Sequence, residues 1–284
     1  MTAVADRSVA FRPLRRVLSW QLRWIGVLVV GAALYAAVLI ALLGTGDVLY
    51  VPALLLVGAA VVPVTFITVV DRLGRSGLSF AQVATAAALG GVIGIVIAGS
   101  LEYATASRSG SLPTWTVGLI EESAKLVVPA VILLWRRPAP LDGVVLGVAV
   151  GSCFAVLETM GYGFVALLRS GGNLDSVTQL LVIRSVTEPG GHAAWTGLAC
   201  AALYSIRGSR RRWAGWLRFL VVFAGVVGLH ASWDSLTSNR GYLILGTVSF
   251  ILLMATTWRL HRDRDRAPAR RGGQWAPRSA LVTT

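Results

Sequence analysis

The chain has 284 residues, of which 55% are hydrophobic and 14% are charged. A soluble domain usually carries about 25% charged residues, so this composition excludes a soluble globular protein and predicts a multi-pass integral membrane protein. The formal net charge is +13. The arginines occur in short clusters between apolar segments, which is typical of loops at a membrane surface and does not indicate nucleic-acid binding.

Eight apolar segments predict an all-α, polytopic bundle of about eight transmembrane helices, since a helix needs about 20 apolar residues to cross a bilayer. They cover residues 24–43, 48–70, 80–99, 115–135, 144–168, 186–206, 213–234 and 242–260. The first is long for the apolar part of a signal peptide, so we expect it to be retained. The predicted organisation is a basic arm (1–23), a membrane core (24–260, with its motifs in 115–234) and a disordered tail (261–284).

The distribution of arginine predicts the orientation of the chain. If the N-terminus is inside, 21 of the 25 arginines lie on the cytoplasmic side of the membrane. The four on the outer side are Arg108, Arg169, Arg184 and Arg240. Because cytoplasmic loops are enriched in basic residues, both termini are predicted to be cytoplasmic.

Residues 118–129 read GLIEESAKLVVP and place three ionisable groups, Glu121, Glu122 and Lys125, in an apolar run. Each such group costs roughly 2.5–3.5 kcal/mol at membrane depth, so the cluster indicates function. Glu121 and Lys125 stand four residues apart, in the order that favours pairing on a helix. We therefore expect Lys125 to hold Glu121 and to leave Glu122 freer for chemistry. The alternative is a structural ion pair within the bundle.

Four further costly groups, Glu158, His192, His230 and Asp234, occur in other predicted spans. On the predicted topology, all of them fall in the outer half of the bilayer, which indicates one shared, water-accessible pocket. The sequence Pro-Gly-Gly at 189–191 predicts a helix break directly before His192, and irregular backbone at this depth is expected where it lines a cavity.

EESAK at 121–125, FAVLE at 154–158, His192 after Pro-Gly-Gly and HASWD at 230–234 resemble, in order and spacing, the four motifs of the PrsW family of intramembrane proteases. The resemblance covers about 115 residues. It implies cleavage of a single-pass membrane protein near the outer face of a bacterial plasma membrane, with an anti-sigma factor as the founding type of substrate. The related CAAX-protease and bacteriocin-processing group has other residues at positions 125, 158 and 234, so prenyl-CAAX processing is not expected.

With this resemblance, the predicted catalytic residues are Glu121, Glu122, Glu158, His192, His230 and Asp234, with Lys125 as a supporting ion pair. Peptide hydrolysis needs an activated water, a proton donor and stabilisation of the oxyanion. In the preferred mechanism, which needs no cofactor, Glu121 or Glu122 activates the water together with Glu158. The histidines then orient water or stabilise the oxyanion, and Asp234 fixes the tautomer of a histidine.

Two alternatives use the same groups. A zinc protease would hold its metal through His192, His230 and Glu158, with the fourth position open, as in many catalytic zinc sites. A proton-coupled transporter would use the buried acids, histidines and lysine as a relay. The lack of an internal repeat and the confinement of the cluster to the outer half disfavour the transporter.

Overall fold

The structure is all-helical over the described residues, as predicted. The computed structural model describes residues 13–74, 76–136 and 138–266, and every regular element in these ranges is a helix. The elements are α1 (Pro13–Thr45), η1 (Val48–Tyr50), α2 (Val51–Gly74), α3 (Phe80–Ser109), α4 (Thr114–Lys125), α5 (Val127–Trp135), α6 (Pro140–Arg169), α7 (Leu174–Thr187), η2 (Glu188–Gly190), α8 (His192–Ser205), α9 (Arg212–Asp234) and α10 (Asn239–Arg266). The first helix, α1, begins within the predicted arm, and the last helix, α10, ends within the predicted tail. The remaining residues of the arm and tail, 1–12 and 267–284, lie outside the described residues.

Six of the described helical segments are long and apolar enough to cross a membrane, so the chain is a multi-pass integral membrane protein. They are α1, η1 with α2, α3, α6, α9 and α10. The other two predicted spans are broken helices. The segment 115–135 forms α4 and α5, which meet at Leu126, and the segment 186–206 contains the end of α7, then η2 and α8.

The two breaks have different origins. Gly191 separates η2 from α8 with an irregular backbone (φ −101°, ψ −129°), which confirms the predicted interruption before His192. The break at Leu126 was not predicted, although its cause is in the sequence. Pro129 has no N–H to donate to the carbonyl of Lys125, so the helix cannot continue through this turn unchanged. The hydrogen bonding resumes with Ala130, whose N–H donates to Leu126 at 2.8 Å.

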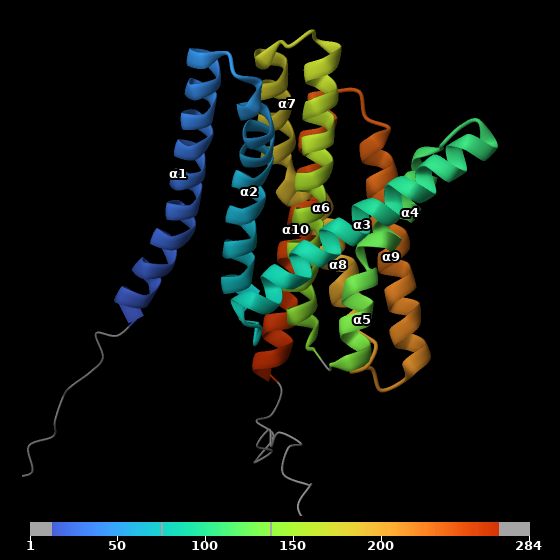
Figure 1. The fold of residues 1–284 in the computed structure, drawn as a ribbon. Helices are drawn as coiled ribbons and strands as arrows, with labels where there is room; N and C mark the ends of the chain where they lie inside the picture. The colour runs from blue at the N-terminus through green and yellow to red at the C-terminus, as the bar shows by residue number, and fades with distance from the viewer. Residues whose placement is uncertain (1–12, 75, 137, 267–284) are drawn as a thin grey trace, which may run out of the picture.

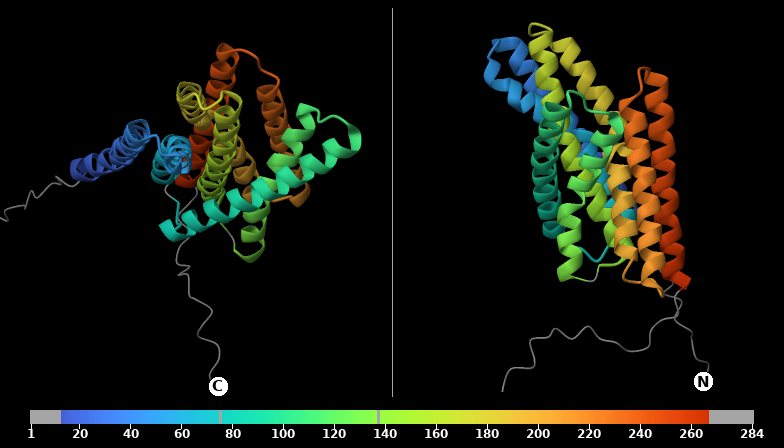
Figure 2. Two further views of the ribbon diagram at one scale, coloured as in Figure 1. Left: turned by 45° about the horizontal axis from the view of Figure 1, so that its top comes forward. Right: turned by 90° about the vertical axis from the view of Figure 1, so that its right-hand side faces the viewer.

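Helix α6 lies in the middle of the bundle and α1 lies at its edge, beside α2 (Figures 1 and 2). Most of the apolar stretch of α6 is buried, 78% of it, against 6% for α1. Helix α3 runs obliquely across the bundle, and α4 folds back from its end toward the centre (Figure 1). The described start of α1 and the end of α10 lie at the same end of the bundle.

Glycines at every fourth position of α6 let α8 approach its backbone. A Cβ atom at Gly143, Gly147 or Gly151 would lie 2.8, 2.4 or 2.3 Å from a carbonyl oxygen of α8. Small residues at this spacing are typical of close helix packing in membranes, where apolar burial does not drive association. This contact fixes α6 against α8 and thereby brings Glu158 to His192.

We expect Gly147→Ala to lower stability by about 1–3 kcal/mol, because the added methyl group overlaps the backbone of α8. The midpoint of thermal unfolding of the purified protein in detergent measures this effect. Gly161→Ala, on the same helix, is the matched control, since nothing lies within 4 Å of the methyl group it would add. Equal midpoints for the two variants would contradict the assigned packing.

Candidate active site

Four helices bring the predicted catalytic side chains together. Glu121 and Glu122 come from α4, Glu158 from α6, His192 from the first residue of α8, and His230 and Asp234 from the last turns of α9. The α4 carboxylates, Glu158 and both histidines are buried or nearly so, and Asp234 is partly exposed. Each of the six lies within 4 Å of another member of the set, so they form one connected network.

Lys125 is fully buried and contacts three members of the network. Its Nζ lies 2.7 Å from Oε1 of Glu122 and 3.1 Å from Oε2 of Glu121. The same ammonium group lies 2.6 Å from Nδ1 of His192. The expected pairing of Lys125 with Glu121 is therefore confirmed, and the expectation that it leaves Glu122 free is wrong. Residues three and four positions away on a helix share a face, so one ammonium reaches both carboxylates.

The two neighbouring glutamates face different surroundings. Glu122 is completely buried and accepts hydrogen bonds from Lys125, from Nδ1 of His230 at 2.8 Å and from Thr196 at 3.5 Å. Glu121 lines the adjacent cavity. Its buried Oε2 forms the 3.1 Å ion pair with Lys125 and accepts no hydrogen bond from another described residue. Glu121 is thus the less engaged carboxylate of this pair and the one that a substrate or an ion can reach.

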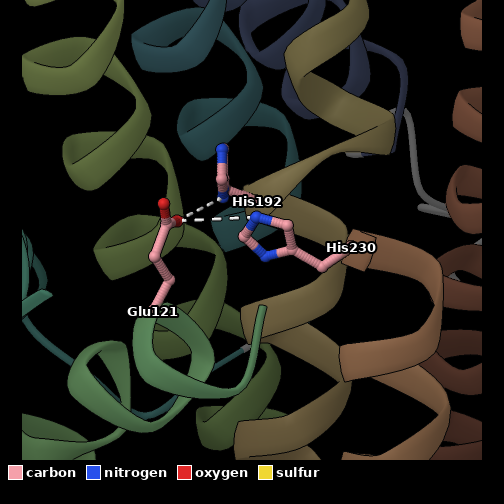
Figure 3. Close-up of side chains that lie close together, drawn as sticks. All are labelled: Glu121, His192 and His230. Carbon is pink, nitrogen blue, oxygen red and sulfur yellow. Dashed lines mark ion pairs between the residues drawn. The ribbon is translucent and has the colours of Figure 1, made fainter. Parts of the chain in front are cut away.

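Each histidine has one ring nitrogen close to a carboxylate of the network. Nε2 of His192 lies 3.1 Å from Oε2 of Glu158, and Nδ1 of His230 lies 2.8 Å from Oε1 of Glu122. An ionised carboxylate only accepts hydrogen bonds, so these two nitrogens carry a hydrogen. The second ring nitrogens, Nδ1 of His192 and Nε2 of His230, lie 3.8 and 3.7 Å from Oε2 of Glu121. Figure 3 marks these two contacts with dashed lines.

Glu121, His192 and His230 fit the donor set of a zinc site. One ligand atom from each lies within 4.8 Å of the others. In a tetrahedral site with bonds of about 2.1 Å, ligand atoms lie roughly 3.4 Å apart. Hydrogen bonds from the second ring nitrogens to carboxylates are typical of metal-binding histidines. For His192 to bind an ion through Nδ1, the ammonium group of Lys125 has to move away from that nitrogen.

Glu158 was predicted as the carboxylate ligand, and the structure gives it other partners. Its Oε2 accepts hydrogen bonds from His192 and, at 2.5 Å, from Nη2 of Arg184. Arg184 also donates to Thr159 at 3.0 Å and stacks on the ring of Tyr162. The sequence analysis had placed Arg184 in an outer loop. The available signal was its position within the apolar stretch LLVIRSV of α7.

A cavity of about 1010 Å³ opens beside this network. It is lined by residues of α3, α4, α6, α7, α9 and α10, and its charged lining residues are Glu102, Glu121, Glu158, Arg184 and Asp234. Oδ2 of Asp234 lies 3.4 Å from Nε2 of His230. Glu102 was not among the predicted site residues.

The fold and the site together define a class of protein, a polytopic membrane protein in which carboxylates and imidazoles from four helices form a buried network beside a cavity. A family model described as PrsW family intramembrane metalloprotease matches residues 25–258, and the chain belongs to this family. The predicted resemblance and the assignment to the proteases are thereby confirmed. The comparisons with curated proteins and with solved structures give no match.

Proposed function

We propose that the protein is a metal-dependent intramembrane endopeptidase that hydrolyses a peptide bond of a single-pass membrane protein in the cavity beside Glu121. One observation carries the proposal. Nδ1 of His192 and Nε2 of His230 both face Oε2 of Glu121, while Glu158 and Glu122 bind the opposite ring nitrogens. The description of the PrsW family as metalloproteases supports the same conclusion.

We further propose eight membrane crossings, in which α4 with α5 and α7 with α8 are broken spans, and a cytoplasmic location of both termini. The arginine distribution supports this orientation. The position of the start of α1 and the end of α10 at one end of the bundle supports an even number of crossings. Cleavage then takes place near the extracytoplasmic face of the plasma membrane. An anti-sigma factor is the type of substrate that the resemblance implies.

In this mechanism, Glu121, His192 and His230 would hold the ion. When bound, a zinc ion would act as a Lewis acid for the attacking water and the scissile carbonyl group. Glu122 and Glu158 hold the imidazoles in the orientation that binding requires. Asp234 lines the cavity, and its one close charged contact among the described residues is the 3.4 Å approach to His230. Asp234 is therefore the carboxylate best placed to take a proton from the attacking water and return it to the leaving amine.

A metal-free glutamate mechanism is the second candidate, and the position of Lys125 favours it. The ammonium group already offsets the charge of Glu121 and Glu122 and is within hydrogen-bonding distance of Nδ1 of His192. In this version, Oε2 of Glu121 accepts the proton of the attacking water directly. Glu121 then replaces Glu122 as the preferred base, because Glu122 is buried and fully engaged.

Metal removal distinguishes the two mechanisms. We expect the purified protein to contain roughly one zinc per chain, to lose cleavage on treatment with a chelator and to regain it when zinc is added. Elemental analysis and cleavage of a reconstituted single-span substrate measure the two properties. His230→Ala should lose both the metal and activity, whereas Asp234→Asn should lose activity and retain the metal. Full activity of metal-free protein would establish the glutamate mechanism.

A further inference from the structure

Glu102 is an acidic residue in the wall of the catalytic cavity that neither mechanism uses. Helices α3 and α4 form a hairpin, in which Gly110 follows the end of α3 and Pro113 precedes the start of α4. Glu102 lies eight residues before Gly110, and Glu121 lies eight residues after Pro113. The two carboxylates therefore lie at similar depths along the hairpin. Oε1 of Glu102 is buried, and no described residue donates a hydrogen bond to it.

The balance of charge in the cavity determines what Glu102 can bind. Four acidic residues line the cavity, and Arg184 is the one basic residue among its lining residues. Arg184 is already bound to Glu158 at 2.5 Å. Lys125 does not line the cavity and is fully buried against Glu121 and Glu122. Among the described residues, Glu102 therefore has no cation paired with it, although a buried carboxylate oxygen without a donor is costly.

A peptide segment that enters the cavity can supply the missing donor. We propose, on the basis of the proposed function, that the enzyme selects a substrate with a lysine or arginine near the scissile bond and that Glu102 binds this side chain. A cationic side chain both donates to the carboxylate and reduces the excess negative charge. A backbone N–H group or a polar neutral side chain provides only the hydrogen bond.

The other lining residues near Glu102 suit such a side chain. Ile95 and Ala98 on α3 and Val117 on α4 line the same cavity. Lysine and arginine bury their aliphatic stems along apolar surfaces and keep the charged end at a polar group. Basic residues are scarce on the extracytoplasmic side of membrane spans, so the requirement for one would restrict the set of substrates.

The test uses the full-length protein and a set of single-span peptides that differ at one position. Lys, Arg, Leu or Glu is placed in turn at each position of the extracytoplasmic half. Cleavage rates and the rise in the unfolding midpoint on peptide binding are measured for the wild type, Glu102→Gln, Glu102→Arg and Gln179→Ala. Gln179 also lines the cavity and is the uncharged control.

At one position of the peptide, we expect the wild type and Gln179→Ala to cleave the Lys and Arg peptides with a kcat/KM about tenfold or more above that of the Leu peptide. The difference should lie mainly in KM. In Glu102→Gln this ratio should approach one, and in Glu102→Arg the preference should shift to the Glu peptide. A loss of folding cannot produce this inversion.

Equal stabilisation of the wild type by the Lys and Leu peptides would overturn the inference, whether or not the peptides are cut. A ratio that is unchanged in Glu102→Gln would also overturn it. Lysine-dependent stabilisation without any cleavage would instead refute the proposed protease function and support Glu102 as a binding residue.

Discussion

Glu121→Gln should reduce cleavage by about 10³-fold or more, since both candidate mechanisms need the Glu121 carboxylate, as a metal ligand or as the base. The substitution retains the shape of the side chain and removes its charge. Glu121 lines the cavity, and its Oε2 is paired with Lys125, which Glu122 also binds, so the main effect should be on kcat, with a smaller loss of stability. Initial rates with a reconstituted single-span substrate measure the loss.

Two variants serve as controls for this result. Asp175→Asn changes an exposed acid in the first turn of α7 and should leave the rate unchanged. Glu122→Gln changes the buried neighbour, which binds Lys125, His230 and Thr196, and should lower stability as well as activity. A Glu121→Gln protein that is folded and cuts at the wild-type rate would exclude this carboxylate from the chemistry.

The sequence was sufficient to predict the helical bundle and the convergence of four motifs, because charged groups in apolar segments are rare and costly. It could not show which glutamate faces the cavity. Glu121 and Glu122 differ by about 100° around α4, and the packing of α4 against α8 and α9 decides which of them lines the cavity. Local spacing predicted Glu122 as the free carboxylate, whereas in the structure Glu122 binds His230 and Glu121 lines the cavity.

Glu102 and Arg184 were missed because the third predicted span ended before Glu102 and the sixth predicted span began after Arg184. The third predicted span stopped at Gly99, but α3 continues to Ser109 and includes Glu102. The sixth began at Val186, two residues after Arg184, while α7 carries Arg184 toward Glu158. An apolar run gives the length of bilayer that a helix crosses, and a helix can extend past it into a polar cavity that only the tertiary structure reveals.

Lys125→Met should lower the free energy of unfolding by about 3–5 kcal/mol, because it removes one partner of a buried ion pair and leaves two carboxylates without their cation. Lys125 is completely buried and lies within 3.1 Å of both glutamates. Unfolding in mixed detergent micelles, followed by circular dichroism, measures the change. The double variant Lys125→Met/Glu122→Gln should recover part of the loss, since one uncompensated charge is then absent.

The size of this loss should also depend on metal. A divalent ion bound by Glu121, His192 and His230 would offset the charge that Lys125 offsets in the structure, so zinc-loaded Lys125→Met should be less destabilised than the chelated variant. If both forms are destabilised equally, the ammonium group and the ion do not substitute for each other, and Lys125 is the cation on which the two glutamates depend. If neither form is destabilised, the buried network does not contribute to folding through charge compensation.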